Sequence, residues 1–170
     1  MQIASNGLIY VVDESPNAEV RYRARFYFTP NSITMAEGDA YYLLTGYDAL
    51  TSTPKLVLYV ELRFTAGAYQ LRLRQNDDSQ STRSTSWVTV SNASHSIELE
   101  WRAATAVGAN NGNLTLWVDD LQRATLTGLD NDTRRIDRVR VGAAGEIDTG
   151  TRGIYYIDAF ESRRQTYIGP

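Results

Sequence analysis

Arginine and tyrosine recur at alternate positions in three segments of this sequence. A guanidinium group binds a carboxylate or sulfate through two parallel hydrogen bonds, and a tyrosine ring offers a flat apolar surface to one face of a sugar. These residue types at this spacing predict a surface that binds acidic glycans. The ten residues predicted to form it are Arg21, Arg23, Arg25 and Tyr27 in the first segment, Tyr59, Glu61 and Arg63 in the second, and Gln70, Arg72 and Arg74 in the third.

This prediction requires the three segments to be neighbouring strands of one sheet, because only then do their alternate side chains share a face. The alternative is a solvated face on which arginine and glutamate side chains of adjacent strands pair with one another. Both interpretations are compatible with the sequence.

Acidic residues in two places indicate a second kind of site. Asp158 interrupts the apolar segment 154–160, where a carboxylate is costly unless it is paired or bound to a metal. Asp130, Asn131 and Asp132 form an oxygen-rich turn of the kind that suits calcium. Hydrogen bonds from an arginine or from backbone amides would satisfy Asp158 equally well, so both explanations of this residue stay open.

Residues for catalysis are few. His95 is the only histidine and no Gly-x-Ser-x-Gly motif is present, so nucleophilic catalysis is not predicted and His95 is expected to be an edge or turn residue. The segment 145–150 (GEIDTG) matches the start of a jelly-roll glucanase motif, but Thr151 stands where the second catalytic glutamate would be. An enzyme would need a base within hydrogen-bond reach of the sugar. Three residues of the polar face could supply one: Tyr27, Tyr59 and Glu61.

The composition narrows the class of protein. The chain has 170 residues, a formal net charge of −3 and no cysteine. This fits one domain with an ordinary core and excludes disulfides and thiolate metal sites. Mixed charges argue against a nucleic-acid binder, and no apolar segment reaches the ~20 residues that a membrane-spanning helix needs. The N-terminal segment lacks the basic and apolar regions of a signal peptide.

Alternation of apolar and polar residues with period two runs through most of the chain. The clearest example is 96–128, where two alternating strands, a loop of small residues and a third strand form a meander. Turn-forming residues separate about eleven such strands, and no amphipathic helix is predicted. The pattern predicts an all-β fold, an antiparallel two-sheet jelly-roll sandwich, in a single domain over residues 1–170. The predicted core contains Phe26, Phe28, Leu58, Val60, Leu99, Trp101, Leu116 and Val118.

Four motifs in the second half of the chain carry a resemblance to a known family. They are WVTVSNASHSIELEWRAA (87–104), the hairpin NGNLTLWVDD (111–120), the segment RVRVGA (138–143) and the final strand GIYYIDAFESRR (153–164). Together they resemble the laminin-G/concanavalin A-like lectin domain, and in particular the LamG-like modules of exported bacterial proteins. The likeness extends over roughly residues 20–164 as a pattern. Asp120 departs from it, because the hairpin of that family usually has glycine there.

The resemblance implies a sandwich of two curved antiparallel sheets, calcium near a sheet edge, and binding of carbohydrate or protein. It favours a non-catalytic, lectin-like module of a larger secreted or cell-surface bacterial protein, with an acidic glycan as the expected partner. Two alternatives remain. One is an adhesive or assembly module that binds other protein subunits, and the other is a polysaccharide lyase or glycoside hydrolase.

The resemblance also suggests where calcium would bind. The first and last strands often lie side by side in jelly rolls of this kind, which would bring Asp13 next to Asp158. Asp13 and Asp158 are therefore the predicted calcium ligands, ahead of Asp130 and Asp132 in the acidic turn.

Overall fold

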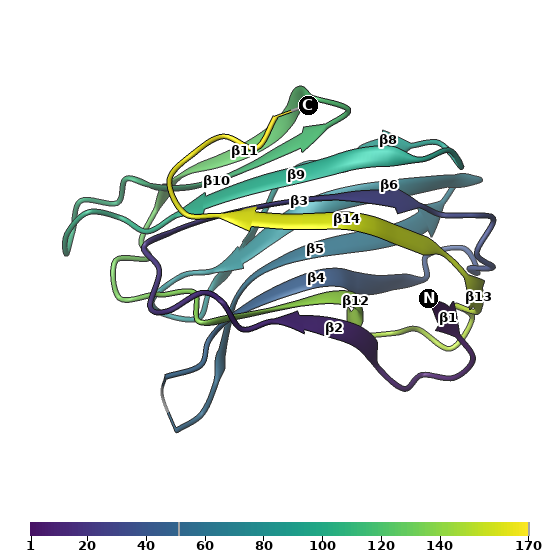
Figure 1. The fold of residues 1–170 in the computed structure, drawn as a ribbon, viewed down its shortest axis with the longest axis horizontal. Helices are drawn as coiled ribbons and strands as arrows, with labels where there is room; N and C mark the ends of the chain where they lie inside the picture. Colours follow the sequence, from purple (N-terminus) through teal and green to yellow (C-terminus); the bar gives the residue numbers. More distant parts are fainter. Residues whose placement is uncertain (51, 170) are drawn as a thin grey trace.

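A computed structural model describes residues 1–50 and 52–169, and its regular structure in those ranges is entirely β (Figure 1). No helix there is long and apolar enough to cross a bilayer. The strands are β1 (Gln2–Ile3), β2 (Ile9–Asp13), β3 (Arg21–Thr29), β4 (Ala40–Asp48), β5 (Lys55–Thr65), β6 (Ala68–Asn76), β7 (Thr82–Ser84), β8 (Val88–Val90), β9 (His95–Arg102), β10 (Gly112–Val118), β11 (Leu121–Leu129), β12 (Arg138–Gly145), β13 (Gly153–Ile154) and β14 (Tyr156–Arg163).

Two large antiparallel sheets form the two layers of the sandwich (Figure 1). The five-stranded sheet has the order β11-β10-β9-β3-β14. The seven-stranded sheet has the order β2-β12-β4-β5-β6-β7, with β8 also paired to β6. β1 and β13 form a separate short pair. The predicted jelly-roll sandwich is confirmed.

The core lies between the two sheets, and all eight residues predicted to form it are at most 4% exposed. Trp101 of β9 donates a hydrogen bond from its indole N–H to Gln75 Oε1 of β6 at 3.0 Å, which links the two sheets through their interior. Successive side chains of a strand point to opposite faces. The polar residues between these core positions therefore lie on the two outer faces of the sandwich.

The central meander, β9 to β11, has the predicted form. Asp119 and Asp120 connect β10 to β11 in a two-residue turn, with φ angles of 53° and 63°. A type I′ turn needs positive φ at both central residues, and aspartate is one of the few residues besides glycine that adopt it. Asp120 thus stands in for the expected glycine without loss of the hairpin.

Candidate functional site

The ten residues predicted to bind a ligand lie on two opposite faces of the sandwich. β3 sits between β9 and β14 in the five-stranded sheet, whereas β5 and β6 pair with each other in the seven-stranded sheet. The prediction of a single face was therefore wrong. Alternation shows which residues of a strand point outward, but it does not show which strands become neighbours. Six of the ten stay together on the outer face of the seven-stranded sheet: Tyr59, Glu61, Arg63, Gln70, Arg72 and Arg74.

The register of β5 and β6 makes these six residues a compact patch. Directly opposed residues of an antiparallel pair have Cβ atoms about 4.5–5.5 Å apart. Tyr42 of β4 and Trp87, which precedes β8, extend the patch on either side. We call these eight residues the arginine–aromatic face. Its three cross-strand pairs are Tyr59 with Arg74, Glu61 with Arg72, and Arg63 with Gln70.

Trp87 lies against two guanidinium groups. The guanidinium carbons of Arg63 and Arg72 are 3.9 and 4.2 Å from the centre of its ring. Gln70 accepts hydrogen bonds from Arg63 Nε at 2.9 Å and Nη2 at 2.7 Å, which fixes the orientation of that guanidinium. A planar guanidinium held on an aromatic ring keeps its edge available for a bidentate acceptor. The sequence prediction did not include Trp87, although Trp87 and Thr89 alternate toward this face.

Tyr42 and Tyr59 form an aromatic pair beside Arg74. Their ring centres are 4.5 Å apart, and the guanidinium of Arg74 is 4.9 Å from the Tyr59 ring. Gly145 of β12 makes room for Tyr42, because a Cβ there would lie 2.8 Å from Tyr42 Cδ2. Burial, together with the neighbouring Tyr59 and the charge of Glu146, raises the pKa of Tyr42 to about 12. Tyr42 is consequently a neutral hydrogen-bond donor at neutral pH.

Positive charge is in excess on the arginine–aromatic face. Glu61 is 8% exposed, and its Oε2 accepts a hydrogen bond from Arg72 Nε at 2.6 Å and lies 3.5 Å from Arg74 Nη1. One carboxylate therefore serves two guanidinium groups, while Arg63 is bonded to neutral Gln70. Arg74 Nε is buried and has no hydrogen-bond partner in the described part of the chain. The face thus carries three guanidinium groups and one carboxylate.

The β3 arginines have a different environment. Arg23 bonds to Glu98 and Glu100 of β9, and Arg21 also bonds to Glu100. Arg25 lies 3.3 Å from a carboxylate oxygen of Asp120. These arginines thus pair with acidic side chains, mostly across adjacent strands, as in the alternative to ligand binding given above. That alternative expected a solvated face, whereas most of these charged side chains are buried. Tyr27, the fourth predicted residue of β3, is 41% exposed on the same face.

The predicted calcium pair is not brought together. Asp13 ends β2 of the seven-stranded sheet, and Asp158 lies in β14 of the five-stranded sheet. β14 does approach β2, because Ser162 Oγ donates to Asp13 Oδ2 at 2.8 Å. Asp158, however, lies four residues away, or about 13 Å along a strand. Its side chain is exposed, and its Oδ1 accepts the N–H of Ala159 at 2.8 Å, so it needs no metal.

Asp13 already has a full set of donors. Its carboxylate accepts hydrogen bonds from the backbone and side chain of Ser15, from Tyr22 Oη at 2.9 Å, and from Ser162. Burial alone would raise its pKa, but these hydrogen bonds outweigh burial and hold the pKa below its usual range. Asp13 therefore acts as a structural acceptor between the two sheets.

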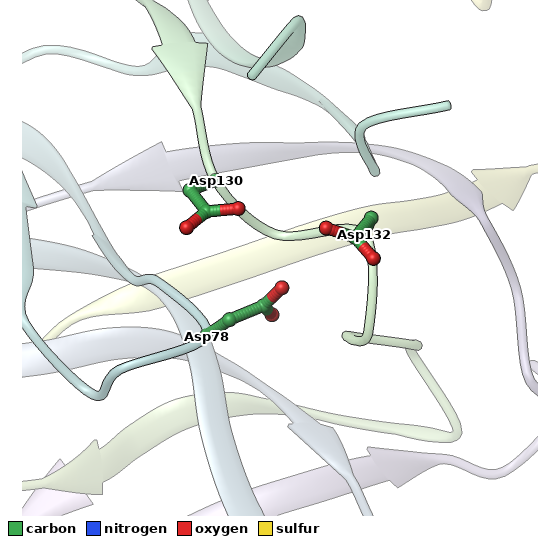
Figure 2. A group of neighbouring side chains, drawn as sticks. All are labelled: Asp78, Asp130 and Asp132. Carbon is green, nitrogen blue, oxygen red and sulfur yellow. The ribbon is translucent and has the colours of Figure 1, made fainter. Parts of the chain in front are cut away.

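Three other carboxylates do converge, at the end of the sandwich where the loop after β6 meets the turn after β11. Figure 2 shows Asp78, Asp130 and Asp132 pointing toward one another, and a ligand oxygen from each lies within 4.8 Å of the others. Asp78 also accepts hydrogen bonds from Thr133 and lies 3.5 Å from Arg134 Nε. The oxygens suit a calcium ion better than the Asp13–Asp158 pair does. Calcium stays a prediction, now for this acidic corner.

Comparison with known protein families and with curated proteins finds no match. Solved structures do match over nearly the whole chain. The endo-β-1,4-glucuronan lyase of Trichoderma reesei matches with a TM-score of 0.64 and 14% identity, over 94% of this chain and 76% of the lyase. The SAP-like pentraxin of Limulus polyphemus gives 0.61 and 10%, over 94% and 71%. An alginate lyase Aly36B mutant bound to alginate tetrasaccharide gives 0.58 and 11%, over 96% and 79%.

These similarities define the class of fold. The chain is a jelly-roll β-sandwich of the concanavalin A-like kind. At such low identities the similarity concerns the backbone alone, so the function has to be argued from this chain's own side chains.

Proposed function

We propose that the protein binds acidic polysaccharides and that the arginine–aromatic face is a non-catalytic binding surface for them. The observation that carries the proposal is the stack of Arg63 and Arg72 on Trp87, beside a carboxylate shared by two arginines. This arrangement offers guanidinium edges to anions and rings to sugar faces.

The chemistry of the face matches a uronate polymer. A uronate carboxylate can accept two parallel hydrogen bonds from one guanidinium, and the half-buried ring of Tyr42, which rests on the buried ring of Tyr59, can pack against the apolar face of a pyranose. Two of the structural neighbours named above are a glucuronan lyase and an alginate lyase, both acting on polymers that carry carboxylates. These two neighbours show that the fold is compatible with a surface for this class of polymer, and the choice of polymer rests on the side chains described above.

Binding is favoured over cleavage by the acid–base groups on the face. Elimination from a uronate needs a base that removes a proton from carbon. Tyr42, with a pKa of about 12, is protonated at neutral pH, and Glu61 is held by Arg72 and Arg74. The single histidine, His95, lies in β9 of the other sheet. Tyr59, the other candidate base of this face, is 3% exposed and is packed against Tyr42 and Arg74. The face can therefore hold a uronate, whereas none of these three side chains is an accessible, unpaired base.

Native gel electrophoresis in gels that contain alginate, pectate or a neutral glucan tests the proposal. We expect the wild type to be retarded by alginate and pectate, less so as salt is added. Each guanidinium–carboxylate contact is worth about 1.5–3 kcal/mol, so the R63A/R72A/R74A variant should lose affinity by roughly a hundredfold or more. The matched control is R102A/R123A, which removes two exposed arginines from the five-stranded sheet.

Three outcomes contradict the proposal. Equal retardation of the triple variant and the control would show that the face does not bind. Retardation only by the neutral glucan would refute the acidic ligand. Release of unsaturated uronate products, followed by ultraviolet absorbance, would show that the protein is a lyase and not a binding module.

A further inference from the structure

Ser91, His95 and Asp119 form a hydrogen-bonded chain at one end of the sandwich. Ser91 Oγ lies 2.9 Å from His95 Nε2, and His95 Nδ1 lies 2.7 Å from Asp119 Oδ2. Ser91 follows β8, His95 begins β9, and Asp119 begins the turn between β10 and β11. Pairing of β9 with β10 brings these segments together. His95 is the first residue of β9, an interior strand, and not the edge or turn residue that was expected; the sequence prediction also did not anticipate its two partners.

The hydrogen bonds assign the tautomer of the neutral imidazole. The backbone N–H of Ser91 donates to His95 Nε2 at 3.2 Å, and a backbone N–H can only donate. Nε2 is therefore the acceptor nitrogen, and Nδ1 carries the proton that Asp119 accepts. Ser91 Oγ–H must then also donate to Nε2. This is the direction of proton transfer that a serine nucleophile, a histidine base and an orienting carboxylate require.

The neighbouring groups hold this arrangement in place. Asp119 Oδ1 accepts the backbone N–H of Ser96 at 3.1 Å, so both of its carboxylate oxygens are fixed. The His95 side chain is 13% exposed, whereas Ser91 is open to solvent. The N–H of Ala93 donates to Ser91 Oγ from 3.2 Å and helps to hold this hydroxyl in place.

We propose that Ser91 is a nucleophile and that this site hydrolyses small acyl esters. Ser91 Oγ attacks the ester carbonyl carbon, its proton moves to His95 Nε2, and the electron pair of the C=O bond moves to the carbonyl oxygen. Collapse of this intermediate breaks the bond to the leaving alcohol, which takes the proton from His95. Water then attacks the acyl-serine in the same way and releases a carboxylic acid. Asp119 is the positioning residue that holds the imidazole.

The location of Ser91 points to an ester carried on a polymer, and this part rests on the function proposed above. Trp87 and Thr89 lie on the outer side of β8, where Thr89 bonds to Gln70 of the arginine–aromatic face at 3.3 Å. Ser91 directly follows β8, four residues after Trp87, so the two lie at most about 13 Å apart along the chain. A polysaccharide bound at Trp87 would extend toward Ser91. The substrate class is therefore O-acetyl esters on an acidic glycan.

Two probes that need no glycan test the nucleophile: hydrolysis of p-nitrophenyl acetate and labelling by a fluorophosphonate, with the labelled residue identified by mass spectrometry. We expect labelling at Ser91 and slow turnover, because the Ala93 N–H is bonded to the nucleophile and not to the carbonyl oxygen of the ester. S91A should abolish labelling, and S91A and H95Q should each reduce turnover by at least ~10²-fold. S94A, an exposed serine of the same loop, is the matched control and should behave as wild type. Labelling elsewhere, or unchanged turnover in S91A, would overturn the proposal.

The role of Asp119 has its own readout. His95 is the only histidine, so its ring ¹⁵N resonances are unambiguous and report the tautomer directly. We expect the Nδ1-protonated form in the wild type and its loss in D119N, together with the loss of labelling. The other tautomer in the wild type would refute the assignment.

Acetate release from O-acetylated alginate separates this proposal from the preceding one. If the glycan surface feeds the site, R63A/R72A/R74A loses acetate release from the polymer but hydrolyses p-nitrophenyl acetate normally. If the triple variant releases polymer acetate at the wild-type rate, the link to the arginine–aromatic face is refuted while the nucleophile stands. Loss of both reactions in S91A alone supports the nucleophile whatever the binding surface.

Discussion

Replacing Arg23 by alanine is expected to destabilise the fold far more than replacing any arginine of the arginine–aromatic face. The Arg23 side chain is 6% exposed, although it lies on the outer face of the five-stranded sheet. Its Nη1 is 3.1 Å from Glu98 Oε1, and its Nη2 is 2.5 Å from Glu100 Oε2. The rings of Trp117 and Tyr167 cover it at 5.1 and 4.8 Å. R23A therefore removes an ion-pair partner from both Glu98 and Glu100, and the two carboxylates differ in the partners that remain.

In R23A, Glu100 keeps other ion-pair partners, whereas Glu98 loses the arginine that pairs with it. Glu100 keeps Arg21 at 2.5 Å and Arg102 at 2.8 Å. Glu98 is 3% exposed, its Oε2 has no hydrogen-bond partner in the described residues, and Arg23 is the partner of its Oε1. Removing one partner of a buried pair typically costs about 3–5 kcal/mol, because the other charge stays buried and unpaired. At about 2–4 °C per kcal/mol for a chain of this length, we expect a decrease in Tm of roughly 6–20 °C.

Urea unfolding followed by circular dichroism measures this cost. The matched control is R102A, which also removes a partner of Glu100 but has a side chain that is 46% exposed, so it should cost about 0–1 kcal/mol. Replacing both charges, as in R23M/E98L, should recover most of the loss. If R23A costs no more than R102A, or if R23M/E98L is as unstable as R23A, the unpaired-carboxylate reasoning is wrong.

Two further predictions concern protons and metal. Burial alone would raise the pKa of Glu100, but hydrogen bonds from Arg102, Arg23 and Arg21 outweigh it and lower the pKa. Its contribution to stability is therefore present above the unfolded-state pKa of about 4.3 and is lost as pH falls below it. We expect E100Q to flatten the decrease in unfolding free energy below pH ~4.3, and an unchanged acid limb would contradict this. For the acidic corner, millimolar calcium should raise the Tm of the wild type but not of D130N/D132N. A wild-type Tm that neither calcium nor chelator moves would rule out calcium there.

The sequence predicted the strands and core well, because a buried face forces apolar residues to alternate along each strand. It could not predict sheet membership. β3 pairs with β9, far along the chain, and nothing in the alternation of Arg21–Tyr27 specifies that partner. The calcium pair failed for the same reason, since β2 and β14 approach each other from different sheets. The group of Ser91, His95 and Asp119 was missed because Asp119 lies far from the other two in the sequence. The pairing of β9 with β10 brings it beside His95, and no sequence motif marks that contact.

The same residue type has opposite roles on the two faces, and the neighbouring strand decides which. The arginines of β3 face β9, which supplies Glu98 and Glu100, so their charge is balanced by carboxylates of the protein itself. The arginines of β6 face β5, which supplies Glu61, and each also lies against an aromatic ring: Arg72 on Trp87 and Arg74 on Tyr59. An aromatic ring stabilises a guanidinium without neutralising it. The second environment leaves positive charge available to a ligand, which is why binding is assigned to the seven-stranded sheet and stability to the five-stranded one.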